Sequence, residues 1–242
     1  MSLCIIVPCY NEAKRFPLAR FEQFISSHEN VHLILVDDGS KDNTLDLITT
    51  LATKYSEQIS VIALPKNKGK ATAVQEGMWM AYENKSITKF AYLDADLSTS
   101  LEECFSLSNL INSNSHFVFG SRVLKEDNTI ERKWYRYIIG RVIANLIAQM
   151  LGIRVYDTQC GCKIISRDWV KVGFDGPFSS RWLFDVELFY RFINAFGKEQ
   201  MVSSSEEIPL KQWIDTDDSR VKFSYFFKLW SDLWLIRQRY KK

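Results

Sequence analysis

The sequence has few of the residues that bind zinc or build disulfide frameworks. It contains only three histidines, and its five cysteines follow no repeating spacing. Cys160 and Cys162 stand in alternate positions of an expected strand, a spacing poorly suited to a bridge between them. Because structural zinc sites need clustered cysteines and histidines, this composition argues against one and predicts reduced thiols in a cytosolic protein.

Long apolar runs and an excess of one charge are also missing. No run of about 18 apolar residues occurs, so no segment of this sequence is predicted to span a membrane. The 31 Lys and Arg residues nearly balance the 29 Asp and Glu residues, which argues against a nucleic-acid partner. The P-loop pattern and the glycine pattern of dinucleotide sites are absent, which argues against Walker-type ATPases and dinucleotide-dependent dehydrogenases.

The sequence does have a regular alternation of short apolar runs and longer segments of mixed polarity. The runs, which predict buried strands, are 3–7, 31–36, 61–64, 90–93 and 117–119. The mixed segments, which predict helices, are 13–27, 43–56, 69–84 and 101–112. This order predicts a single α/β domain over residues 1–242, with a mostly parallel sheet and helices on both faces.

Polar clusters follow the carboxyl ends of the expected strands. The clusters are 10–12, 37–38, 66–70, 94–96 and 121–122. Ligands of open parallel sheets bind at that edge. The pattern therefore predicts a site for a large ligand, with both anionic and cationic walls.

Asp94 and Asp96 place two carboxylates at the end of a buried strand. If the strand continues, both side chains point to the same side and converge on one cation. Hard oxygen ligands suit magnesium or manganese, which complete their shell with phosphate oxygens and water. The alternative is a solvated turn that caps the following helix.

Two further clusters suit a nucleotide diphosphate. Asp37 and Asp38 exceed what the capping of a helix start requires, and they are better explained as acceptors for ribose hydroxyls or a base N–H group. The basic loop 66–70 precedes a helix, and its amides and lysines are suited to phosphate. A solvated basic loop is the alternative for this segment.

In their order and spacing, the motifs resemble those of family 2 glycosyltransferases of the GT-A fold. The residues that carry this resemblance are Pro8 to Glu12, Asp37 to Ser40, Asn67 to Lys70, Asp94 to Asp96 and Gly120 to Arg122. Residues 157–163 and 181–187 resemble the dolichyl-phosphate β-glucosyltransferase branch, close to the dolichyl-phosphate mannose synthases. The chain departs from that branch at Cys162, where an aromatic residue is usual, and at 218–220, where relatives tend to carry Gly-Ser-Lys.

The resemblance implies that the two halves of the chain bind different substrates. Residues 1–122 would bind the nucleotide sugar and the metal, and residues 123–242 would bind the acceptor. Asp96 would be the main metal ligand, assisted by Asp94. The catalytic candidates are Asp96, Arg122, Arg136 and Asp185. The candidates for substrate binding are Pro8, Tyr10, Glu12, Asp37, Asp38, Lys70, Asp94, Gln159, Trp182 and Arg220.

The class of acceptor separates two enzymatic hypotheses. A glycan hydroxyl needs a carboxylate base, for which Asp185 and Glu187 are available. A polyprenyl phosphate is already ionised and needs cations instead, which Arg122 and Arg136 would provide. The resemblance favours transfer of a hexose, in particular glucose from UDP-glucose, to the lipid phosphate. A protein that binds a nucleotide sugar or a glycan without catalysis is the remaining alternative.

Two segments bear on contact with a membrane. Residues 134–151 are amphipathic and begin with aromatic residues. Residues 223–236 carry an apolar stripe, made of Phe223, Phe226, Phe227, Trp230, Leu233 and Trp234, with basic residues around and after it. This C-terminal amphipathic helix is typical of peripheral contact with the cytosolic face of a membrane, and equally of a helix packed on the core.

Overall fold

The computed structural model describes residues 2–125, 128–131, 134–214 and 225–240. Its main sheet has seven strands in the order β3-β2-β1-β4-β7-β5-β8. The strands are β1 (Ser2–Cys9), β2 (Val31–Asp37), β3 (Ile59–Ala63), β4 (Ile87–Tyr92), β5 (Phe117–Ser121), β7 (Lys163–Ser166) and β8 (Ser205–Pro209). All neighbours in the sheet are parallel except β7, which runs antiparallel to both β4 and β5. The predicted mostly parallel sheet is confirmed.

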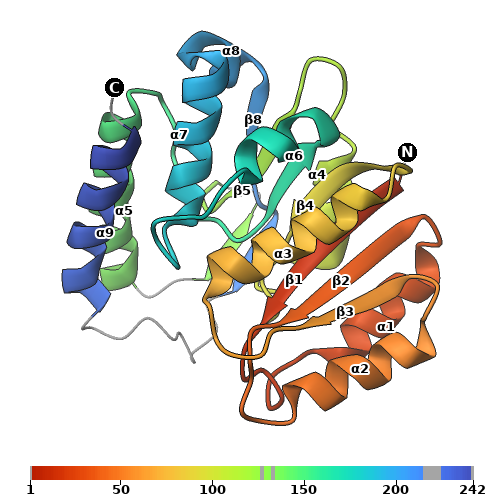
Figure 1. The fold of residues 1–242 in the computed structure, drawn as a ribbon. Helices are drawn as coiled ribbons and strands as arrows, with labels where there is room; N and C mark the ends of the chain where they lie inside the picture. Colours follow the sequence, from red (N-terminus) through yellow and green to blue (C-terminus); the bar gives the residue numbers. More distant parts are fainter. Residues whose placement is uncertain (1, 126–127, 132–133, 215–224, 241–242) are drawn as a thin grey trace.

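Helices cover both faces of the sheet (Figure 1). The helices are α1 (Leu18–Ser27), α2 (Thr44–Lys54), α3 (Lys70–Glu83), α4 (Leu101–Ser108), α5 (Trp134–Leu151), α6 (Arg167–Phe174), α7 (Phe184–Phe196), α8 (Lys198–Ser203) and α9 (Tyr225–Tyr240). One core cluster joins the sheet to α3, α6 and α7, and the other joins it to α1, α2 and α4. Alternate residues of β1 enter opposite clusters, as expected for a strand buried on both faces.

The helix predicted over 13–27 begins later, at Leu18. Pro17 is its N-cap residue, and residues 12–16 form a turn in which the amides of Arg15 and Phe16 donate to the carbonyl of Glu12. Proline disfavours helical geometry in the residue that precedes it, which explains the late start. The turn keeps the 10–12 cluster next to the end of β1.

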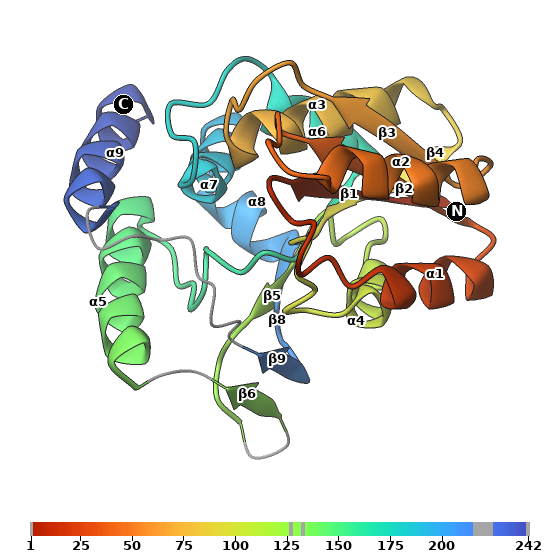
Figure 2. The same cartoon turned by 90° about the horizontal axis from the view of Figure 1, so that it is seen from below.

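The short strands β6 (Thr129–Glu131) and β9 (Gln212–Ile214) form a separate parallel pair. β9 follows the edge strand β8, and β6 follows β5. Figure 2 shows this pair beyond the β5 and β8 side of the main sheet. The main sheet itself takes strands from both the 1–122 and the 123–242 segments.

Helices α5 and α9 lie next to each other at one side of the molecule in both ribbon views (Figures 1 and 2). α9 packs on α7, and its Leu229, Leu233 and Ile236 are buried in the core. Trp230 and Trp234 are 49% and 59% exposed, so the predicted stripe is divided between the core and the surface. The side chains of Phe223, Phe226 and Phe227 lie outside the described residues. No helix within the described ranges is long and apolar enough to cross a membrane.

The division of α9 makes adjacent residues respond differently to substitution. We expect Leu233→Ala to lower the free energy of unfolding by about 2–5 kcal/mol, because it leaves a cavity at a position that is 2% exposed. Trp234→Ala, the matched control on the exposed side, should change it by less than about 0.5 kcal/mol. Urea denaturation of both variants measures the difference, and equal effects would show that α9 does not pack as described.

Candidate active site

The carboxyl ends of β1, β2 and β4 bring the first polar clusters together. Cys9 pairs with Asp37 across β1 and β2, and the Asp38 amide donates to the Cys9 carbonyl at 2.8 Å. β4 pairs with β1 on its other side, also in parallel, so the 94–96 turn leaves the sheet at the same edge. The 10–12 turn therefore lies between the two acidic clusters, as the sequence predicts.

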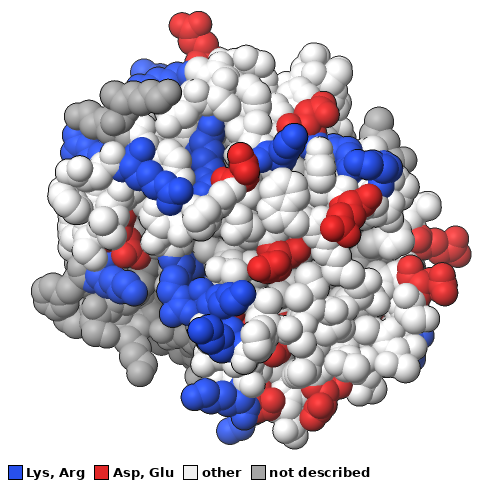
Figure 3. Space-filling view, in the orientation of Figure 1, with Lys and Arg blue, Asp and Glu red and all other residues white. Residues whose placement is uncertain are grey.

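Asp38 holds the basic loop between β3 and α3. Its Oδ1 accepts from the amide of Lys68 at 2.6 Å, and its Oδ2 accepts from the amide of Gly69 at 2.8 Å and from Nδ2 of Asn67 at 2.9 Å. Burial raises the pKa of Asp38, while the loop amides act in the opposite direction. Figure 3 shows Lys and Arg side chains gathered over this loop and the start of α3. The carboxylate thus fixes a cationic loop at the edge of the site.

Asp37 has an acceptor available for a ligand. Its side chain is buried, and Oδ2 accepts from the Ser40 amide at 3.0 Å. Oδ1 has no hydrogen-bond partner in the part of the chain that the structure describes. An unpartnered buried oxygen is costly, so a hydroxyl or N–H donor on a ligand would find a ready acceptor here.

Glu12 connects the first turn to the acidic turn after β4. It is buried, and its Oε2 lies 2.5 Å from Nε of Arg15. Nη1 of Arg15 is 4.0 Å from Oδ2 of Asp96. Pro8 and Tyr10, the other predicted binding residues of this segment, are half-buried at the same end of β1. Glu12 therefore orients a cation toward Asp96.

Lys70 and Asp94 form a close ion pair at the start of α3. The Lys70 Nζ lies 2.5 Å from Oδ1 of Asp94. Burial alone would lower the pKa of Lys70, but the carboxylates of Asp94, Asp185 and Asp96 outweigh it and raise the pKa above its ordinary value. Lys70 is therefore a fixed positive charge on the acidic side of the site.

The donor set of the 94–96 turn fits a hard divalent cation. Asp94 and Asp96 offer carboxylate oxygens, and their side chains are 41% and 18% exposed. Oδ1 of Asp96 also accepts from the amide and hydroxyl of Ser98, so the capping role considered above is present as well. No group of three or more His, Cys, Asp or Glu ligands occurs in the described ranges. Two carboxylates suit magnesium or manganese, which leave most positions to phosphate and water.

Arg122 lies at the end of β5 and is held by Asp157. Its Nε and Nη2 donate to the two carboxylate oxygens at 2.6 and 2.9 Å, and its guanidinium lies 5.3 Å from the Trp213 ring centre. Burial alone would raise the pKa of Asp157, but the charge and hydrogen bonds of Arg122 lower it well below its usual range. Glu207 in turn accepts from the amides of Tyr156 and Asp157. The cation predicted at this strand end is therefore rigidly placed.

Asp185 and Glu187 lie in the first turn of α7 and are both engaged by protein donors. Asp185 is 4% exposed and accepts from Lys163 Nζ at 2.6 Å and from the Tyr92 hydroxyl. Glu187 is fully buried and accepts from the amides of Ser179 and Ser180. As placed, neither carboxylate faces solvent.

Four predicted site residues remain to be placed. Gln159 is half-buried, and its Nε2 has no hydrogen-bond partner among the described residues. Trp182 is 41% exposed just before α7. Arg136 belongs to α5, but its side chain, like the whole of Arg220, lies outside the described residues.

Sequence reasoning missed several side chains that organise the site. Asp157 and Lys163 both belong to the 157–163 motif, but the sequence does not indicate the partner of either residue. Tyr92 lies inside an apolar run, which hides its hydroxyl. Arg181 donates to the carbonyls of Asn67 and Lys68 and so joins the segment before α7 to the basic loop.

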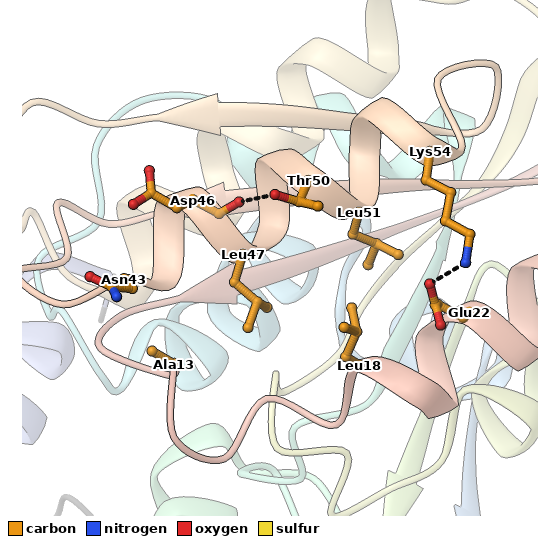
Figure 4. Close-up of a pocket in the computed structure, with 9 residues that line it drawn as sticks. All are labelled: Ala13, Leu18, Glu22, Asn43, Asp46, Leu47, Thr50, Leu51 and Lys54. Carbon is orange, nitrogen blue, oxygen red and sulfur yellow. Dashed lines mark hydrogen bonds and ion pairs between the residues drawn. The ribbon is translucent and has the colours of Figure 1, made fainter.

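A separate surface groove lies between α1 and α2 (Figure 4). Its volume is about 480 Å³, and the Glu22–Lys54 ion pair crosses it at one end. None of the predicted site residues lines this groove.

A mostly parallel sheet with helices on both faces and acidic turns at one edge is the architecture of the GT-A fold. The solved glucosyl-3-phosphoglycerate synthase of Mycobacterium tuberculosis, in complex with Mn²⁺, uridine diphosphate and phosphoglyceric acid, has this architecture. It superposes with a TM-score of 0.68 at 15% identity, covering 98% of this chain and 78% of that chain. The mannosyl-3-phosphoglycerate synthase of Rubrobacter xylanophilus gives a TM-score of 0.69 at 14% identity, covering 99% and 73% of the two chains.

Residues 4–174 match the model of glycosyl transferase family 2, and the chain belongs to this family. Curated relatives extend the similarity beyond that region. A dolichyl-phosphate beta-glucosyltransferase of Trichomonas vaginalis is 33% identical, over 98% of this chain and 73% of its own length. The dolichyl-phosphate beta-glucosyltransferase of Homo sapiens is 28% identical, over 99% and 76%. The family predicted from the motifs is confirmed.

The Arg122–Asp157 pair generates a prediction about stability and pH. We expect Asp157→Asn to lower the free energy of unfolding at neutral pH by about 3–5 kcal/mol, because the change leaves a guanidinium whose side chain is only 16% exposed without its counter-charge. The folded-state pKa of Asp157 lies below its unfolded value of about 3.9. The stabilisation is therefore complete above that value and is lost as pH falls toward the folded-state pKa.

Urea denaturation of the wild type and of Asp157→Asn from pH 7 to pH 3 tests this linkage. The stability difference between the two proteins should be constant near neutral pH and shrink below about pH 4. A difference that stays constant down to pH 3 would contradict the assigned pairing.

Proposed function

We propose that the protein transfers a hexose, with inversion, from a nucleotide sugar to a polyprenyl phosphate, using a divalent cation. UDP-glucose is the proposed donor. The similarity to curated dolichyl-phosphate beta-glucosyltransferases over nearly the whole chain supports this assignment. The observation that carries the choice of acceptor is that Asp185 and Glu187 are both buried and bonded to protein donors, whereas the cation of Arg122 stands at the strand edge.

The donor would lie across the ends of β1, β2 and β4. The unpartnered Oδ1 of Asp37 would accept from the ribose or the base. The basic loop, whose amides at Lys68 and Gly69 are bonded to Asp38, would face the diphosphate with its lysines. Asp94 and Asp96 would hold magnesium or manganese, which when bound neutralises charge on the leaving diphosphate. Lys70 and Arg15 add fixed cations on the same side.

The acceptor phosphate would be oriented on the acceptor side. Asp157 fixes the guanidinium of Arg122, which would bind the phosphate and aim one oxygen at the anomeric carbon. Arg136 is proposed as a second cation for this group, and Gln159, Trp182 and Arg220 as further contacts. The attacking oxygen of the acceptor phosphate is already ionised, so a single in-line displacement needs no general base. A glycan hydroxyl would need one, and both carboxylates of α7 already accept hydrogen bonds from protein donors.

The side of the molecule formed by α5 and α9 is proposed to contact a lipid bilayer. Exposed apolar residues on α5 are Ile138, Ile139 and Val142, and those on α9 are Trp230, Trp234 and Leu235. Lys228, Arg237 and Arg239 of α9 are exposed as well. Aromatic and aliphatic side chains flanked by cations suit the headgroup region of an anionic membrane.

Calorimetric titration with UDP- and GDP-sugars, with and without manganese, followed by turnover with a short polyprenyl phosphate, tests the proposed reaction. We expect manganese-dependent binding of UDP-glucose and transfer to the lipid phosphate. Asp96→Ala should abolish turnover and weaken metal-dependent nucleotide binding, since it removes the main proposed ligand. Asp46→Ala, which changes an exposed aspartate in the α1–α2 groove, is the matched control and should behave as wild type.

The outcomes separate the hypotheses. Metal-dependent binding of the donor without turnover of the lipid phosphate would favour a glycan hydroxyl as the acceptor. Binding with no transfer or donor cleavage under any condition would favour the non-catalytic alternative. Unchanged activity of Asp96→Ala would reject the metal assignment.

Flotation with vesicles of phosphatidylcholine and phosphatidylserine tests the membrane contact. We expect the double change Trp230→Ala and Trp234→Ala to weaken vesicle binding by about tenfold, because two aromatic anchors are lost. Met80→Ala is the control, since Met80 is 40% exposed on α3, away from this side. Equal binding of both variants would show that the exposed side of α9 does not contact lipid.

A further inference from the structure

Lys163 is a lysine with no exposed surface, at the first position of β7. Removing an ammonium group from water is costly unless it is paired and hydrogen-bonded. The antiparallel direction of β7 places this residue opposite Tyr92 of β4 and Phe119 of β5, at the edge where the site lies. A charge placed there needs close partners, and its partners belong to the site.

The ammonium group of Lys163 binds two different segments. It donates to Oδ1 of Asp185 at 2.6 Å and to the carbonyl of Cys160 at 2.6 Å. Tyr92, whose hydroxyl also donates to Asp185, carries a ring centred 5.4 Å from the same nitrogen. Lys163 therefore joins the first turn of α7 to the turn at 157–162.

That turn is packed directly against both halves of the site. A Cβ added to Gly161 would collide with the carboxylate of Asp94, so the backbone there lies against the proposed metal ligand. The carbonyl of Cys162 accepts from the Gly120 amide at 3.0 Å, just before Arg122. Moving the turn would displace groups on both the donor side and the acceptor side.

The charges around Lys163 alternate in sign. The charge of Lys163 contributes to lowering the pKa of Asp157, and the charge of Asp185 contributes to raising the pKa of Lys70. In order, the series is Arg122, Asp157, Lys163, Asp185, Lys70 and Asp94. Lys163 stands between the two outer pairs, each of which is assigned above to one substrate.

We propose that Lys163 is a positioning residue, which touches neither substrate but holds the Arg122–Asp157 pair and the Lys70–Asp94 pair at a fixed separation. The inference rests on the proposed function for the roles of those pairs. Displacing reacting groups by about 1 Å costs about a hundredfold in rate, whereas each substrate keeps its own binding contacts. Loss of Lys163 should therefore act on kcat more than on the KM of the donor.

Lys163→Met tests this with Lys89→Met as the control. Lys89 is 8% exposed and lies at the opposite end of the same β4–β7 pair, across from Ser166. We expect Lys163→Met to lower kcat about a hundredfold with the donor KM within about threefold of wild type. Amide hydrogen exchange in 157–162 should become faster in Lys163→Met and stay as in wild type in Lys89→Met.

If Lys163→Met does not fold, the double variant Lys163→Met with Asp185→Asn removes both charges and takes its place. A wild-type kcat in either variant, or a loss confined to the donor KM, would overturn the proposal. Unchanged exchange in 157–162 would overturn it whatever the acceptor. Failure of the wild type to use polyprenyl phosphate would instead refute the proposed function, while the exchange data would still decide whether Lys163 holds the turn.

Discussion

An antiparallel strand in the middle of an otherwise parallel sheet sets the geometry of the whole site. In a parallel sheet, only the segments that follow the strands reach the ligand-binding edge. Because β7 runs against β4 and β5, its amino end and the turn before it reach that edge too. The 157–162 turn therefore lies between the end of β4, with its acidic residues, and the end of β5, with Arg122. The proposed donor and acceptor sides are therefore both in contact with this turn.

Buried and half-buried carboxylates fix several of the loops around the site. Asp38 accepts from amides of the basic loop, Glu207 from amides at 156–157, and Glu187 from amides at 179–180. Each carboxylate satisfies backbone donors that a buried loop would otherwise leave unpaired. Loops held in this way need little rearrangement when a charged ligand arrives, which is the condition for electrostatic preorganisation.

The sequence predicted the strands whose local apolar pattern matches their burial in the folded protein. Continuous apolar runs located β1 to β5, because a strand buried on both faces has no polar positions to confuse the pattern. The strand expected over Cys160 and Cys162 was misplaced: both residues lie in the turn before β7, which is short and begins at Lys163, a residue that resembles a solvated strand end. β8 is only half-buried and carries two glutamates. The hydrogen bonds of Asp38 to the basic loop were not predicted, because its partners lie about thirty residues further along the chain and only the fold brings them close.

The choice between a phosphate and a hydroxyl acceptor likewise rests on contacts that the sequence motifs do not show. Asp185 and Glu187 stand in the sequence as candidate bases, and only their burial shows that protein donors already use them. In the proposed reaction the acceptor must then bring its own negative charge, and the fixed guanidinium of Arg122 is suited to receive it. α7 carries these carboxylates in its first turn and packs against both α5 and α9. α7 therefore connects the helices that are proposed to contact the bilayer with the carboxylates beside the proposed site.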